Sequence, residues 1–268
     1  MNNKYRLYKG AWIYDHDPHN EVKLSDKDIK RLLGEDGMMV RNVYDFDCPQ
    51  QTSFWYVIKD SFGGMEELSP KMRNQVKRCF KTMRVEKISS EVLLKHGYEV
   101  FVLAADNYKV KATPPTKSEF ESRLKTADEN EFWACFDIAT DRMVAFCMNA
   151  VTSESCEYRT MKAIPEYQKQ YAYYGLIYEM NRYYLEQRGL KYVNDGARSI
   201  TEHSNIQPFL IDKFRFRKAY CNIKIHYKWW LGVAIKLLYP FRNIIQVRKV
   251  RAILNMESMV KKNGAAHS

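Results

Sequence analysis

The sequence between residues 131 and 164 restricts the fold more than any other part of the chain. Residues 131–138 (EFWACFDI) carry the strongest strand signal of the chain. Residues 140–142 form a turn, and residues 143–151 and 156–164 read as two further strands. Strands this close in sequence pair antiparallel, so we expect a three-stranded meander, and the fold has to be organised around a β-sheet.

Helices and strands alternate after this meander. Residues 165–188 carry apolar side chains at helical spacing, and Gly189 is a natural helix terminator. A short apolar strand follows at 190–193, then a helix at about 206–214 and an alternating strand at 219–227. The order β-β-β-α-β-α-β predicts an α/β fold with a central mixed, mostly antiparallel sheet flanked by helices.

The chain divides by composition into three segments. Residues 1–50 are polar and rich in turn residues, so we expect an irregular segment with one short helix near Asp26–Leu33. Residues 51–228 hold the regular patterns and form the predicted domain, which includes a basic amphipathic helix that begins at Ser69-Pro70. Residues 229–268 form a basic, amphipathic helical tail.

Positive charge is concentrated near the C-terminus. The net charge is +11, and the stretch from Lys213 to Met256 contains eleven Lys or Arg residues and no Asp or Glu. The other 32 basic residues balance the 32 acidic ones. Such a localised field indicates an anionic partner, which is a phosphate-bearing ligand, a nucleic acid or an acidic lipid surface.

The six cysteines show no CxxC pattern and no histidine at metal-ligand spacing, so we expect reduced thiols and no metal. The first ten residues are polar, unlike a signal peptide, and no run of 18 apolar residues is present. These features predict a cytoplasmic protein.

The tail has the composition of a helix that lies on a membrane surface. Trp229 and Trp230 stand before a Leu/Ile-rich run, and basic residues flank the apolar ones. This pattern is typical of an interfacial helix on an anionic membrane, which would place the protein on the inner face. The alternative is a helical hairpin docked on the domain's own sheet or on a second subunit of an oligomer.

The strand meander followed by helix, strand, helix and strand resembles the GNAT (acyl-CoA N-acyltransferase) fold. It is also similar to the FemAB-type aminoacyltransferases, which share that fold. Three segments carry the resemblance within about residues 50–227: KMRNQVKRCFK, IPEYQKQYAYYGLIYEMNRYYLEQRGLKYVNDGARSI and FLIDKFRFRKAY.

This resemblance implies where an acyl donor would bind. The carbonyl and pantetheine would lie along strand 156–164 where it separates from strand 190–195, and a pyrophosphate would sit on the amides between Pro165 and Gly175. The implied donor-binding residues are Met161, Lys162, Ala163, Gln168, Lys169, Gln170, Tyr171, Ala172, Tyr173, Gly175 and Asn205.

The donor loop departs from the family's pattern, because Tyr171 and Tyr173 stand where glycines usually let the backbone close on phosphate. Acyl-CoA, with acetyl-CoA as its simplest form, is therefore one candidate donor. A thioester on a carrier protein or an aminoacyl-tRNA would depend less on this loop.

Acyl transfer to an amine needs a proton acceptor and an acid for the leaving group. We consider four catalytic candidates, each with an ordinary structural role as the alternative: Glu157, Asp195, His203 and Tyr174. Glu157 lies in the donor strand, Asp195 follows the next strand, and Tyr174 could supply the acid. Arg198, Ser199 and Lys213 are candidates for binding the acceptor substrate.

The expected function is transfer of an acyl group from a thioester to a small-molecule amine, such as an amino sugar or a bacterial cell-envelope precursor. One alternative is a FemAB-like aminoacyltransferase that uses charged tRNA. The other is a non-catalytic protein on a degenerate GNAT scaffold that binds a membrane or a partner.

Overall fold

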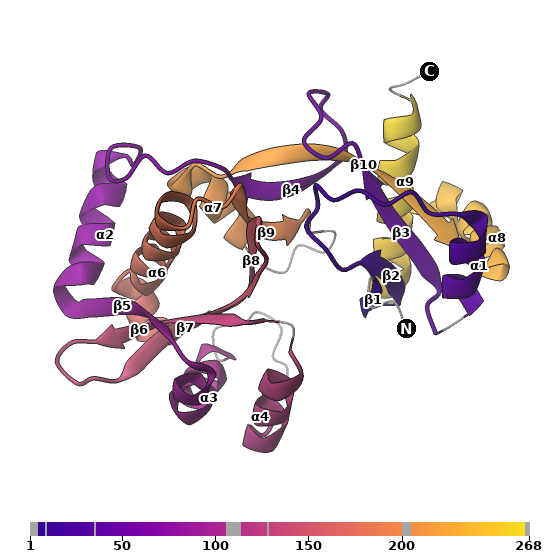
Figure 1. Cartoon of the computed structure of the whole chain (residues 1–268). Coiled ribbons are helices and arrows are strands. Elements are labelled where there is room, and N and C mark those ends of the chain that lie inside the picture. The colour runs from indigo at the N-terminus through magenta and orange to yellow at the C-terminus, as the bar shows by residue number, and fades with distance from the viewer. Residues whose placement is uncertain are drawn as a thin grey trace. The chain divides into compact units, whose positions relative to one another are not determined.

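The computed structural model describes residues 5–8, 10–34, 36–105, 114–127, 129–199 and 205–265. The chain forms two compact units (Figure 1). Unit 1 consists of residues 1–57, 197–205 and 218–268, and unit 2 of residues 58–196 and 206–217. This division differs from the three segments suggested by composition, because unit 1 combines both ends of the chain.

The secondary structure comprises the following elements. The strands are β1 (Tyr5–Tyr8), β2 (Ala11–Tyr14), β3 (Met39–Tyr44), β4 (Phe54–Lys59), β5 (Met83–Ile88), β6 (Glu131–Asp137), β7 (Met143–Val151), β8 (Ser155–Ala163), β9 (Tyr192–Ala197) and β10 (Arg217–Tyr227). The helices are α1 (Asp26–Gly34), α2 (Pro70–Thr82), α3 (Ser90–Ala105), α4 (Lys117–Thr126), α5 (Pro165–Lys169), α6 (Ala172–Asn181), the π-helical η1 (Arg182–Gln187), α7 (Ile206–Phe214), α8 (Trp229–Leu238), the 3₁₀-helical η2 (Tyr239–Phe241) and α9 (Arg248–Ala265).

Unit 2 is built on a sheet with the strand order β9-β8-β7-β6-β5. Neighbouring strands from β5 to β8 are antiparallel, whereas β8 and β9 are parallel. The predicted meander is therefore confirmed as β6, β7 and β8. The predicted mixed, mostly antiparallel sheet flanked by helices is confirmed as well.

Helices cover both faces of this sheet (Figure 1). Helices α3 and α4 pack on one face, because their apolar residues join those of the meander in one cluster that includes Leu93, Phe120, Phe132, Phe146 and Met148. Helix α6 covers the other face and is almost entirely buried. The sheet of unit 2 is thus the middle layer of three.

Unit 1 contains the strand order β1-β2-β3-β10, in which β2 and β3 are parallel and the other two pairs antiparallel. Our expectation of an irregular N-terminal segment is therefore wrong, although the helix predicted near Asp26–Leu33 is present as α1. The strands β1 and β2 have only four residues each, too few to show a clear alternation. Strand β3 finds its partner in β10, at the other end of the chain.

The C-terminal helices dock on unit 1. Leu231 and Ile235 of α8 and Leu254 of α9 form one apolar cluster with Ile13 and Met39. The Tyr227 hydroxyl donates to Glu257 over 2.9 Å. Among the residues that the structure describes, no helix is both long enough and apolar enough to cross a membrane.

Gly175 lets α6 approach α2 closely. A Cβ atom at this position would lie 2.4 Å from Cys79 Sγ and 3.3 Å from the ring of Phe80. Cys79 is fully buried, so it has little room to move. The contact between these two helices therefore requires a residue without a side chain.

We predict that Gly175→Ala destabilises the protein by about 1–3 kcal/mol, although alanine normally favours a helix over glycine. Urea unfolding of both proteins measures the difference. Gly34→Ala is the matched control, because a Cβ there meets nothing within 4 Å. Adding Cys79→Ala to Gly175→Ala should recover part of the loss. Equal unfolding midpoints for Gly175→Ala and the unchanged protein would contradict this account.

Candidate functional site

Strands β8 and β9 pair over a short distance and then separate. Their register pairs Ser155 with Tyr192, and the last pair is Glu157 with Asn194, whereas β8 continues to Ala163. Hydrogen bonding between two parallel strands stops there, so both strands present backbone groups that a ligand can bind. This is the separation of strands that the family resemblance implies.

The Asn194 side chain fixes the point of separation. It is fully buried, and its Nδ2 donates to the carbonyl of Cys156 over 3.2 Å. Its Oδ1 accepts from the amide of Gly196 over 3.0 Å. Gly196 has φ 76°, and a Cβ there would lie 3.3 Å from Glu157 Oε1. The positive φ therefore favours glycine at this position, and a Cβ would also require the Glu157 side chain to shift slightly.

The two predicted catalytic carboxylates do not form a pair. Glu157 lies opposite Asn194 and shares its face of the sheet, whereas Asp195 is the next residue along the strand and points to the other face. Glu157 is bound by Arg159, whose Nε lies 2.8 Å from Oε2. This ion pair accounts for Glu157 without a catalytic role.

Asp195 has an unusual electrostatic environment. Burial of its carboxyl raises its pKa to about 7, and the negative charge of Glu157 acts in the same direction. A hydrogen bond from the Gln207 side chain has the opposite effect and limits the shift. Gln207, at the start of α7, also donates to the Asp195 main-chain carbonyl over 3.3 Å. Asp195 therefore changes its protonation near neutral pH.

The predicted donor loop becomes the short helix α5 and the start of α6. Gln168 donates to the carbonyl of Ala163 over 2.9 Å and so ties the loop to the end of β8. Tyr171 has φ 72°, and no side chain caps the first amides of α6. The guanidinium of Arg78 on α2 lies 5.6 Å from the centre of the Tyr171 ring. This end of α6 thus combines uncapped amides with a nearby cation.

Tyr174 is packed in an aromatic cluster. Its ring centre lies 5.3 Å from that of Tyr171, 5.1 Å from Phe209 and 6.0 Å from Phe214. Burial raises the pKa of the Tyr174 hydroxyl, so it remains protonated. Ala172 is fully buried, and Gly175 faces α2. Packing accounts for Tyr174, Ala172 and Gly175, and their roles in donor binding or catalysis stay predictions.

The remaining predicted donor residues lie in different surroundings. Met161 and Lys162 are half-buried on β8, and the Lys162 ammonium lies 5.2 Å from the ring centre of Phe101. Lys169 and Gln170 are exposed, and Tyr173 is half-buried.

The predicted acceptor-binding residues belong to different units. Arg198 lies in unit 1, where its guanidinium stacks 4.2 Å from the Trp55 ring and donates to the Ser53 carbonyl over 2.6 Å. Ser199 also belongs to unit 1, whereas Lys213 is exposed on α7 of unit 2. Asn205, a predicted donor-binding residue, belongs to unit 1 as well. His203 lies outside the described residues.

The sequence did not identify three residues of this site as functional candidates: Arg78, Asn194 and Gln207. Helical periodicity placed Arg78 on a polar face of its helix, but nothing local connected it with the loop before α6. In the sequence, Asn194 stands in an Asn-Asp-Gly run typical of a turn, and Gln207 stands three residues after Ser204, a spacing typical of a helix cap.

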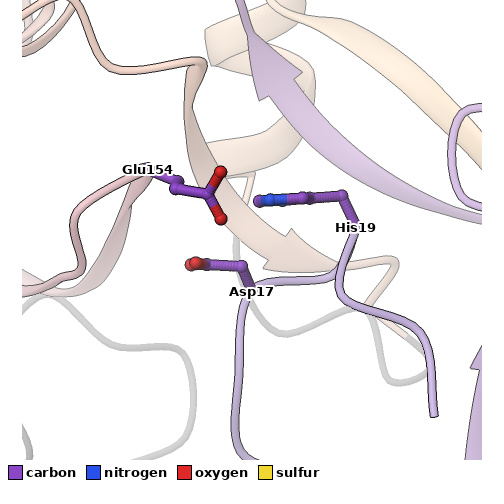
Figure 2. Close-up of side chains that lie close together, drawn as sticks. All are labelled: Asp17, His19 and Glu154. Carbon is purple, nitrogen blue, oxygen red and sulfur yellow. The ribbon is translucent and has the colours of Figure 1, made fainter.

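Figure 2 shows the side chains of Asp17, His19 and Glu154. Asp17 and His19 follow β2 in unit 1, whereas Glu154 precedes β8 in unit 2. Because they belong to different units, we assign no metal site to them.

The order of elements and the separation of β8 from β9 define a GNAT-type fold, as the sequence resemblance predicted. Among solved structures, the chain is similar to FemX, with a TM-score of 0.56 and 10% identity over 84% of this chain and 82% of that one. The similarity to FemX extends over both units, and it establishes the fold.

Two other solved structures are more distant. L-PGS from Bacillus licheniformis has a TM-score of 0.46 and 10% identity over 85% of this chain and 73% of that one. The ribosomal-protein-S18-alanine N-acetyltransferase from Escherichia coli has a TM-score of 0.31 and 18% identity over 40% and 62%. No protein-family model matches the sequence, and no curated protein matches it.

The raised pKa of Asp195 predicts a pH dependence of stability. The unfolded carboxyl releases its proton near pH 4, and the folded one near pH 7, so the folded state holds an extra proton between these values. The free energy of unfolding should therefore fall as the pH rises through this window. Asp195→Asn removes this contribution, and urea unfolding at several pH values should show a shallower fall.

Asp212→Asn, an exposed position on α7, is the matched control and should keep the pH dependence of the unchanged protein. If Asp195→Asn and the unchanged protein lose stability in parallel between about pH 4 and pH 7, Asp195 does not hold the extra proton.

Proposed function

We propose that the chain transfers an acyl or aminoacyl group to the amine of a small molecule, with the reaction at the end of the β8–β9 pair in unit 2. The observation that carries the proposal is the short parallel pairing that ends at Glu157 and Asn194 and places Asp195, with its pKa of about 7, at the point of separation. The GNAT-type fold is consistent with it.

Asp195 is the proposed proton acceptor. An amine attacks the acyl carbon only after its ammonium form has lost a proton, and a carboxylate with a pKa near the working pH accepts that proton efficiently. The nitrogen–carbon bond then forms and the bond from the acyl carbon to the donor's sulfur or oxygen breaks. The second proton that the attacking nitrogen loses passes to the departing sulfur or oxygen, and the first proton remains on Asp195 until solvent accepts it. The half-buried Asp195 keeps a path to solvent for its release.

The start of α6 is the proposed anchor for the donor. The first amides of this helix have no side-chain cap, and a helix N-terminus attracts anions. Arg78 adds a positive charge beside Tyr171, and Lys169 and Gln170 are exposed next to it. These groups suit the phosphates of coenzyme A and equally those of the acceptor end of a charged tRNA.

Two donors therefore have to be distinguished. A thioester such as acetyl-CoA is the first candidate, and an aminoacyl-tRNA is the second. Tyr171 precedes α6 where the family usually has a glycine, so the phosphates of either donor would depend on Arg78 and the helix amides more than on a closely approaching loop backbone.

We predict that acetyl-CoA or a longer acyl-CoA binds saturably in calorimetry, and that Arg78→Glu weakens binding about tenfold or more because it replaces a cation beside the phosphates with an anion. Lys71→Glu, an exposed position at the other end of α2, is the matched control. If no acyl-CoA binds, but charged tRNA binds with a strong dependence on salt concentration, the donor is an aminoacyl-tRNA. If neither binds, the transferase proposal is wrong.

The second prediction concerns Asp195. With the donor that binds and a panel of amino sugars and amino acids, Asp195→Asn should lower the rate of transfer about 100-fold or more at neutral pH, because asparagine cannot accept the proton. Donor binding should not change. Glu157→Gln should have a much smaller effect. A rate for Asp195→Asn close to that of the unchanged protein would refute the assignment of the base.

A further inference from the structure

Helix α8 is apolar on two opposite faces. Leu231 and Ile235 are buried against the core of unit 1. Trp229, Val233 and Leu237 are spaced four residues apart on the other face and are 82%, 52% and 68% exposed. Docking on unit 1 therefore uses only one of the two apolar faces and leaves the second in water.

The exposed apolar side chains continue beyond α8. Phe241, Ile244 and Val247 are 55%, 73% and 64% exposed. We call the set Trp229, Val233, Leu237, Phe241, Ile244 and Val247 the C-terminal apolar face. Outside this segment, Ile138 is the only large apolar residue of the described chain that is more than half exposed. A cluster of this kind indicates an interaction surface, because single exposed apolar residues are ordinary whereas a group is not.

Basic residues accompany the C-terminal apolar face. Lys236 lies on the same side of α8 as Trp229 and Val233, and Lys249 and Arg251 are exposed at the start of α9. No acidic residue occurs between Lys213 and Met256. Tyr239 lies beneath two cations, with Lys261 Nζ at 3.7 Å and the Arg242 guanidinium at 4.6 Å from its ring centre. The surface is thus both apolar and strongly positive.

We propose that the C-terminal apolar face binds an anionic lipid surface, with α8 lying in the interface. The apolar side chains would enter the boundary between headgroups and acyl chains, and the cations would contact anionic headgroups. Tryptophan is suited to this depth, since it has a large apolar ring with one polar N–H group. No helix of the described chain can span a membrane, which agrees with a helix that lies on the surface.

The charge distribution argues for lipid over a second copy of this chain. In a symmetric dimer, the same patch of each copy would face its counterpart. Lys236, Lys249 and Arg251 would then approach the cations of the other copy, and this segment has no acidic residue to neutralise them. Anionic headgroups neutralise these charges instead. This inference does not depend on the proposed transferase activity.

Co-sedimentation of the whole protein with vesicles tests the proposal. The protein should bind vesicles of phosphatidylcholine with phosphatidylglycerol much more tightly than vesicles of phosphatidylcholine alone. The triple variant Trp229→Ser, Val233→Ser, Leu237→Ser should bind at least about tenfold more weakly, because it removes apolar area that would leave water. Ile138→Ser, an equally exposed apolar position in unit 2, is the matched control and should bind as the unchanged protein does.

A charge variant provides the second, independent measurement. Lys236→Glu with Lys249→Glu and Arg251→Glu should abolish the preference for phosphatidylglycerol, whereas Lys95→Glu with Lys125→Glu, both exposed in unit 2, should retain it. The substituted side chains are exposed, and thermal unfolding confirms that each variant is folded. Equal binding to both kinds of vesicle, or no binding, overturns the proposal. A lipid-free dimer that the serine variant dissociates also overturns it, because the surface would then be an interface between copies.

Discussion

The pairing of β8 with β9, held in place by the buried side chain of Asn194, is the constraint on which the rest of unit 2 depends. The Asn194 side chain donates to the carbonyl of Cys156 in β8 and accepts from the amide of Gly196 in β9. A buried amide left without partners would be costly, so this arrangement is strongly determined. It fixes the last point at which β8 and β9 are joined, and Asp195 is the next residue of β9.

The start of α6 illustrates how a helix end can be adapted when glycine is absent. Tyr171 occupies a left-handed conformation that usually belongs to glycine, and its ring is held between Tyr174 and the guanidinium of Arg78. The aromatic contacts stabilise a backbone that would otherwise be strained. The same ring also occupies space before the helix, where the proposed donor would bind.

Sequence patterns were sufficient for the regular part of unit 2. The strand signals of β6, β7 and β8 and the helical spacing in α2 and α6 are local, and each produced the element expected from it. Strands β1 and β2 pair locally but were missed because each has only four residues, too few to show a pattern. Strand β3 was missed because its partner β10 lies far away in the sequence. Likewise, the sequence placed Glu157 and Asp195 near each other, but only the register shows that they point to opposite faces.

The interleaving of the two units has a consequence for synthesis on the ribosome. Most of unit 2 is one continuous stretch, residues 58–196, so its meander can pair as soon as it emerges. Unit 1 cannot, because β3 pairs with β10 and the hydroxyl of Ser53 donates to the carbonyl of Met259. Strand β3 therefore keeps one edge unpaired until β10 has been synthesised. An unpaired strand edge is a site at which another chain can pair, so this edge is exposed to misassembly during that interval.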